Sequence, residues 1–252
     1  MSVGSDHNTA VHVKNNHRLE LLIVKMASEF FLYWGSGSSP CWRVMITLEE
    51  KGLSGYGNKL VSFEKSEHKS EDILKLNPRG QVPTLKHGDI VINESIACML
   101  YLQCTFKDKG NSLLPCSGNP AFKARVLQRL MEVNNIQSAV RGVMMYMRKN
   151  KDNIDEAQLG PLKEALRTEL KRWDDYLKET GDYIAGPSFS LADCAFFPFV
   201  AVLRRQGLDL SKNLPNLSKY YEQHKDRPSI QASWPPHFKE TPDQDNLAKL
   251  YD

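Results

Sequence analysis

The first half of the chain alternates between short apolar runs and helical periods. An apolar run at 30–34 predicts a strand, and a loop of small residues separates it from a helical pattern at about 40–51. A second strand is predicted at 59–65 (KLVSFEK), after a glycine-rich turn. The segment 70–76 predicts a short helix that stops before Pro78, because a residue that precedes proline avoids the α region. This short alternation indicates an α/β unit.

The next segment has the pattern of a β-hairpin. Two apolar runs at 82–86 and 90–92 are joined by a His-Gly-Asp turn. Pro83 stands at the start of the first run, where a proline is tolerated either at a sheet edge or as a cis bond in a tight turn. The polar residues at 93–95 then open a helix that reaches about Phe106. These elements complete a small α/β domain.

The composition changes after about residue 107, and the pattern beyond it is helical. A stretch rich in polar residues, glycine and proline forms the natural linker between two domains. The helices predicted beyond it cover about 120–149, 155–180, 190–206 and 215–224, with a short piece after Pro228. The predicted divisions are an N-terminal extension at 1–27 that we expect to be disordered, an α/β domain at 28–108, a linker at 109–119 and an all-α domain at 120–252.

Two predicted helix starts carry local signals. Pro40 follows two serines at the start of a helix, and either Ser38 or Ser39 can cap it. The start of a helix presents free backbone N–H groups and the positive end of a dipole, so an anion beside this loop is stabilised. Ser190 and Asp193 form a capping box at a later helix start, which is a folding signal and carries no chemistry.

Composition narrows the functional classes. The 252 residues carry 33 Lys and Arg against 30 Asp and Glu, and the net charge of +3 is spread without a basic stripe, so nucleic acid is not an expected partner. The five cysteines form no C-x-x-C pair and have no neighbouring His cluster, which favours a reducing compartment and argues against a disulfide frame or a structural metal. The apolar run at 19–24 is too short to span a bilayer, so we expect no membrane segment.

Three motifs in this order resemble those of the cytosolic glutathione transferases. They are VPTL at 82–85, NES at 93–95 and SFSLAD at 188–193, and the resemblance covers residues 29 to about 238. The segments LYWGSGSSPCWRVMITLEE, NPRGQVPTLKHG and DRPSIQASWPP look most like the rho class of aquatic animals, and SSPCWRV is also similar to the serine-type zeta, theta and tau classes. The resemblance implies a thioredoxin-like α/β N-terminal domain of four strands and three helices, followed by an all-helical domain.

The same resemblance implies a cytoplasmic homodimer that uses glutathione as co-substrate, without a metal. A cis bond to Pro83 would let Val82 offer its N–H and C=O to the cysteinyl residue of glutathione, as an added strand would. Ser95 would bind the γ-glutamyl carboxylate, and Glu94 its ammonium group. The alternatives are that Pro83 is an ordinary edge proline and that Glu94 and Ser95 only complement a helix start.

Two further positions match polar contacts in related classes. Lys69 occupies the place where a basic residue of tau-like enzymes faces the glycyl carboxylate of glutathione. Gln81 matches a polar position that contacts glutathione in theta- and zeta-like members. A solvated lysine and a surface glutamine are the alternatives.

The resemblance also requires a hydroxyl group beside the thiolate of glutathione. Serine-type members place the reactive serine five residues before a helix arginine, and counting back from Arg43 gives Ser38. The Pro-Cys pair of theta-like members aligns with the Pro-Cys pair here and gives the same residue. The hydroxyls that compete in this region belong to Tyr33, Ser36, Ser38 and Ser39.

Tyr33 and Cys41 are the rivals of Ser38. Tyrosine-type classes carry a Tyr-Trp pair on the first strand, as at Tyr33, but its distance to Arg43 is one residue shorter than that pattern expects. Cys41 suggests a thiol transferase, yet the cysteine-type classes place their nucleophile where Ser38 stands. We therefore expect Cys41 to pack within the helix.

The electrophile is expected to lie between the first long helix of the all-α domain and the C-terminal tail. Methionine suits a pocket that adapts to varied apolar shapes, whereas Met and Leu at helical spacing are also usual core residues. The candidates for this pocket are Leu130, Met131, Asn134, Met144, Met145, Arg148, Trp234 and Phe238.

The function implied is conjugation of glutathione to small hydrophobic electrophiles, which is a detoxification reaction, with Ser38 stabilising the thiolate. A zeta-type isomerase would use the same thiolate, and a ligand-carrying or assembly module with this fold would use none. Turnover of a cis-enedione acid, or affinity for glutathione without any turnover, would distinguish these alternatives.

Overall fold

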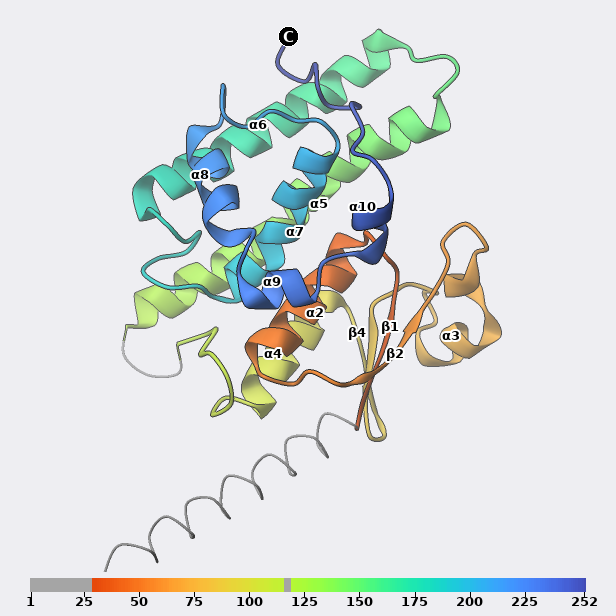
Figure 1. The fold of residues 1–252 in the computed structure, drawn as a ribbon, viewed down its shortest axis with the longest axis vertical. Coiled ribbons are helices and arrows are strands. Elements are labelled where there is room, and N and C mark those ends of the chain that lie inside the picture. The colour runs from red at the N-terminus through yellow and green to blue at the C-terminus, as the bar shows by residue number, and fades with distance from the viewer. Residues whose placement is uncertain (1–28, 116–118) are drawn as a thin grey trace, which may run out of the picture.

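The computed structural model describes residues 29–115 and 119–252 (Figure 1), so the extension predicted at 1–27 lies outside the described residues. The N-terminal domain contains strands β1 (Phe30–Trp34), β2 (Gly57–Leu60), β3 (Thr84–His87) and β4 (Ile90–Asn93). They form a four-stranded sheet in the order β2-β1-β3-β4. The β1–β2 pair is parallel and the other two pairs are antiparallel, which confirms the predicted thioredoxin-like arrangement.

Helices α2 (Ser39–Glu50), α3 (Glu71–Leu76) and α4 (Ser95–Thr105) surround this sheet. In Figure 1, α2 and α4 lie together on one side of the sheet, and α3 lies on the other. Along β1 the residues alternate between buried and half-exposed positions because successive side chains of a strand point to opposite faces. The buried set, with Leu32 and Trp34, forms the core beneath α2.

The second domain is all-helical, as predicted. Its helices are α5 (Pro120–Lys149), α6 (Glu156–Thr180), α7 (Leu191–Arg205), α8 (Pro215–His224), α9 (Pro228–Ala232) and α10 (Pro236–Glu240). Helix α7 is apolar on almost every side because it packs against α5, α8 and α2 at once. The capping box is confirmed at its start, where the Asp193 carboxylate accepts the Ser190 N–H at 2.8 Å.

The strand predicted at 59–65 is wrong over most of its length. Strand β2 ends at Leu60, opposite the last residue of β1, Trp34. The Val61 N–H still donates to the Trp34 carbonyl at 2.8 Å, and beyond that point the partner strand has turned away. The next N–H, that of Ser62, is accepted by a glutamate carboxylate, and the chain turns instead of extending. The apolar pattern alone did not show where the partner strand stops.

The C-terminal helix α10 has no counterpart in the sequence prediction. It is five residues long and begins at a proline, which supplies a favourable first helical position but no apolar period. Across the ranges 29–115 and 119–252, no helix is both long and apolar enough to cross a bilayer.

Candidate active site

Three segments of the N-terminal domain meet at one end of the sheet. Tyr33 near the end of β1 lies opposite Thr84 at the start of β3, and Thr84 lies opposite Asn93 at the end of β4. The β1–α2 loop, the Val82-Pro83 bond and the start of α4 are each within a few residues of this row. The register of the sheet therefore gathers the candidate residues for glutathione that lie far apart in the chain.

Ser38 is the N-cap of helix α2. It has extended backbone geometry (φ −75°, ψ 108°), and its hydroxyl oxygen accepts the Cys41 N–H at a long 3.4 Å. Capping therefore falls to Ser38, whereas Ser39 is the first helical residue and is buried. A serine hydroxyl has one donor and two acceptor positions, and this backbone contact uses only an acceptor. The Ser38 hydroxyl lies at the positive end of α2, where an anion is stabilised.

Cys41 is packed in the helix, as expected from the sequence. Its side chain is fully buried, and its sulfur accepts the Gly35 N–H at 3.4 Å. Burial raises the pKa of the Cys41 thiol to about 11, despite the opposing effects of Ser38, Gly35 and Arg43. Because the thiolate is the reactive form of cysteine, Cys41 is held in an unreactive state.

Tyr33 points to the other face of the sheet. It alternates with the buried residues Leu32 and Trp34, and its ring packs against Phe31 with 4.9 Å between ring centroids. Its side chain therefore lies on the face opposite to α2. This placement favours Ser38 as the hydroxyl beside a bound thiolate.

The structure contains the predicted cis bond between Val82 and Pro83. Val82 is partly exposed and lies two residues before the first residue of β3, so its backbone is at the end of the sheet, where an extended peptide can pair with it. Ser95 is the first residue of α4, and the exposed Glu94 precedes it with φ at +70°, a conformation unusual for a residue with a side chain. A helix N-terminus with an adjacent carboxylate fits the carboxylate and ammonium of a γ-glutamyl group.

Lys69 and Gln81 lie beside the same segment. The Lys69 ammonium donates to the Arg79 carbonyl at 2.8 Å, and the Lys69 stem passes so close to Gly80 that a Cβ there would lie 2.7 Å from it. Gln81 is exposed, and its carbonyl accepts a hydrogen bond from Asn77 at 2.8 Å. Lys69 therefore lies against the segment that precedes Val82, and its ammonium has two further N–H groups for a carboxylate.

The residues predicted to bind the electrophile do not line one common pocket. On α5, Leu130 is fully buried and Met144 is partly buried against the core, whereas the remaining candidates of that helix are exposed: Met131, Asn134, Met145 and Arg148. Trp234 and Phe238 contact the ring of Trp42 in α2 edge-on, at centroid distances of 5.1 and 6.0 Å. The two aromatic residues also line a cavity of about 130 Å³ beside α7. Leu130 thus has the environment of a core residue.

Sequence reasoning missed two residues near the loop. His237 in α10 forms a hydrogen bond to Ser36, although the two are 201 positions apart. Arg43, used above only to set a register, is 1% exposed and donates to Gln137 of α5. Its Nε and Nη1 atoms have no hydrogen-bond partner among the described residues. Burial lowers the pKa of Arg43 to about 10. No spacing pattern links either residue to its contact.

Comparisons with family models agree with this geometry. The model for "Glutathione S-transferase, N-terminal domain" matches residues 37–104, and the model for "Glutathione S-transferase, C-terminal domain" matches residues 135–233. The first of these ranges contains Ser38 and each of the candidate glutathione contacts.

Individual relatives match over most of the chain. Glutathione S-transferase A of Pleuronectes platessa is 47% identical over 226 residues, which cover 89% of this chain and 99% of the relative. Glutathione S-transferase 1 of Dianthus caryophyllus is 34% identical over 72% of this chain and 80% of its own length. The crystal structure of a glutathione S-transferase from the Antarctic clam Laternula elliptica is 45% identical, with a TM-score of 0.81 over 88% of this chain and 100% of that chain.

Proposed function

The chain belongs to the glutathione S-transferase family, and from this premise we propose that it activates glutathione with Ser38 and conjugates it to small hydrophobic electrophiles. The observation that carries the proposal is the position of Ser38. Its hydroxyl oxygen caps α2, so the hydroxyl lies at the helix end that favours an anion. The product of the reaction is a thioether, formed when the thiolate attacks an electrophilic carbon.

The energy of these interactions is sufficient for the task. A cysteine thiol has a pKa of about 8.5, so lowering it by roughly two units requires about 2.7 kcal/mol of preference for the thiolate. A hydrogen bond to a charged group contributes about 1.5–3 kcal/mol, and a helix N-terminus about 0.3–1 kcal/mol. Ser38 and α2 together can therefore hold glutathione as a thiolate at neutral pH without a general base.

The remaining contacts would hold the tripeptide along the end of the sheet. We infer that the Val82 backbone pairs with the cysteinyl residue and that Ser95 and Glu94 bind the γ-glutamyl carboxylate and ammonium. Lys69 would face the glycyl carboxylate of glutathione, and the Gln81 side chain would donate a hydrogen bond to the backbone of glutathione. The transferred group would lie toward α5 and the C-terminal segment, near Met131, Met145 and Phe238.

We also propose that the protein acts as a cytoplasmic homodimer. Strand β4 is the edge of the sheet, and its Ile90 and Val91 are exposed, as is Leu74 of α3. An apolar edge strand is a surface that another chain commonly covers. The free thiols of the described cysteines support a reducing compartment. Analytical ultracentrifugation of the wild type and an Ile90→Lys variant tests the dimer, because the charge should shift it toward monomer.

The role of Ser38 is tested by titrating the thiolate absorbance of bound glutathione. Wild type, Ser38→Ala and Tyr33→Phe should be compared as the pH varies. We expect Ser38→Ala to move the thiol titration to higher pH and Tyr33→Phe to leave it in place. The assignment fails if Tyr33→Phe is the variant that shifts the titration.

A further inference from the structure

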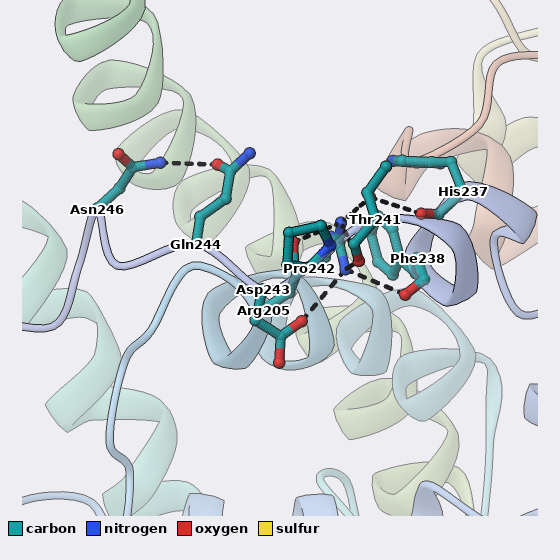
Figure 2. A network of polar contacts seen from close by, with 8 residues as sticks. All are labelled: Arg205, His237, Phe238, Thr241, Pro242, Asp243, Gln244 and Asn246. Atoms are coloured by element: carbon teal, nitrogen blue, oxygen red, sulfur yellow. Dashed lines mark hydrogen bonds and ion pairs between the residues drawn. The ribbon is translucent and has the colours of Figure 1, made fainter.

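Arg205, the last residue of helix α7, makes many of the polar contacts that hold the C-terminal segment after α9. Arg205 is 7% exposed and donates to the backbone carbonyls of Phe238, Thr241 and Pro242 at 3.2–3.3 Å, as Figure 2 shows. It also pairs with Asp243 at 3.2 Å, and its guanidinium lies 4.4 Å from the centre of the Phe238 ring. Such a dense set of contacts gives α10 a fixed position.

The C-terminal segment also fixes the backbone of His237. The Thr241 hydroxyl donates to the His237 carbonyl at 2.7 Å, and the Thr241 N–H donates to the same oxygen at 3.1 Å. Thr241 in turn contacts the Arg205 guanidinium through its hydroxyl oxygen (Figure 2). His237 is therefore linked to α7 by a short chain of polar contacts.

The other side of His237 contacts the loop that carries Ser38. Its Nδ1 atom lies 2.5 Å from the Ser36 hydroxyl oxygen. The neighbouring Gly37 has φ at +76°, and a Cβ there would lie only 2.7 Å from the imidazole Cε1. The approach of the ring thus depends on a glycine in the left-handed region.

His237 is suited to accept this hydrogen bond. Burial lowers its pKa below the usual value, and the positive charge of Arg205 acts in the same direction, while Glu240 opposes them. The neutral imidazole has one acceptor nitrogen, and Nδ1 can take the Ser36 hydroxyl hydrogen. Within the loop, the Ser38 N–H donates to the Gly35 carbonyl at 3.2 Å and the Gly35 N–H to the Cys41 sulfur at 3.4 Å. The Ser38 carbonyl accepts the Cys41 and Trp42 N–H groups at 2.9 Å, so the start of α2 holds one end of the loop and His237 holds Ser36.

We propose that His237 is a positioning residue for the transferase reaction: through Ser36 it fixes the β1–α2 loop so that the Ser38 hydroxyl is directed at the thiolate. This inference rests on the proposed function of Ser38. It assigns to the C-terminal segment a role in activating glutathione, in addition to any contact with the electrophile. Arg205 holds Thr241, Thr241 holds the backbone of His237, and the imidazole of His237 holds Ser36.

The test combines His237→Ala, Ser36→Ala and the double variant, with Lys239→Ala as a control on the exposed side of the same helix. We expect each single variant to lower kcat/KM by about 5- to 30-fold, because small displacements of a reacting group are costly. Each should also move the thiol titration of bound glutathione to higher pH, while the melting temperature stays near that of wild type. Because both variants break the same contact, the double variant should be no worse than the singles. His237→Asn, which keeps an acceptor, should retain part of the activity.

Additive losses in the double variant, or a loss of rate without a shifted thiol titration, would overturn the inference. The role of Ser38 is tested separately, because Ser38→Ala alone must shift the titration. Adding His237→Ala to Ser38→Ala should then cause no further shift. A further shift in that background would show that His237 acts by another route, even though Ser38 keeps its role.

Discussion

Glu50 at the end of α2 and Arg227 before α9 form a two-point ion pair that joins the two domains. Arg227 Nε and Nη2 donate to the two carboxylate oxygens at 2.6 and 2.8 Å, and the Glu50 side chain is 2% exposed. Asn111 also donates to Glu50, and so does the Ser229 hydroxyl. These contacts fix the all-α domain to the C-terminal end of α2, the helix whose N-terminal end carries Ser38.

This ion pair predicts a pH-dependent stability. Burial alone would raise the pKa of Glu50, but hydrogen bonds from Arg227, Ser229 and Asn111 lower it below its ordinary value of 4.5. A folded-state pKa below the unfolded value stabilises the protein above pH 4.5, and that stability is lost as the pH falls further. We expect the free energy of unfolding of Glu50→Gln to fall less than that of wild type as the pH is lowered, measured by denaturant unfolding between pH 7 and pH 3. A constant difference from wild type across that range would contradict the prediction.

At neutral pH the removal of one partner should be costly. Glu50→Ala leaves the guanidinium of Arg227 without its buried carboxylate, and we expect a loss of about 3–5 kcal/mol in the free energy of unfolding. The matched control is Glu71→Ala, which breaks an exposed pair with Lys75 and should cost less than about 1 kcal/mol. Equal losses in the two variants would show that burial does not govern the effect.

The cysteines should differ sharply in reactivity. Cys104 is exposed, whereas Cys41, Cys98 and Cys194 are buried, and burial raises the pKa of each of these three thiols. In a Cys116→Ser background, an alkylating reagent at pH 8 should modify one thiol in the native protein. Mass spectrometry should locate it at Cys104. Alkylation of Cys41 at a comparable rate would contradict the packed role given to that residue.

The capping box at α7 should be a major determinant of stability. The buried Asp193 carboxylate accepts the N–H groups of Ile184 and Ser190 and the Ser190 hydroxyl at 2.8–2.9 Å. Asp193→Ala leaves these donors unpaired in the core, so we expect a loss of about 2–5 kcal/mol. Ser190→Ala removes the hydroxyl that donates to Asp193 and caps the backbone of α7, but it leaves the Asp193 carboxylate with its backbone donors, so it should cost less. Chemical denaturation of both variants would measure the order.

Glu94 should affect binding more than chemistry. Glu94→Gln keeps the size of the side chain but removes the charge that we propose binds the ammonium of glutathione, so KM for glutathione should rise about 5- to 20-fold with kcat changed little. Asp89→Asn in the β3–β4 turn is the control, because it removes an exposed charge of the same domain away from the sheet end. A fall in kcat at unchanged KM would instead place Glu94 in the chemical step.

Much of the fold could be predicted because its signals are local. The bounds of β1, α5 and α8 follow from apolar periods and from prolines at helix starts, and the Val82-Pro83 motif suggested its own cis bond. Strand β2 was misplaced because its end depends on where β1 stops. The contact between His237 and Ser36 could not be predicted, since α10 is too short to show a period and lies two hundred positions from the loop. Ser38 was predicted from its spacing to Arg43, but only the folded chain shows that Ser38, and not Ser39, caps α2.

The pairing of β3 with both of its neighbours has a consequence for how this sequence can vary. Thr84 stands opposite Tyr33 on one side and Asn93 on the other. Deleting one residue within β3 would reverse which side chains enter the core and would also displace the Val82 backbone. A residue inserted at the turn after His87 would change only an exposed loop. Selection should therefore remove deletions in β3, because they impair both folding and activity. Changes of length at the turn should accumulate.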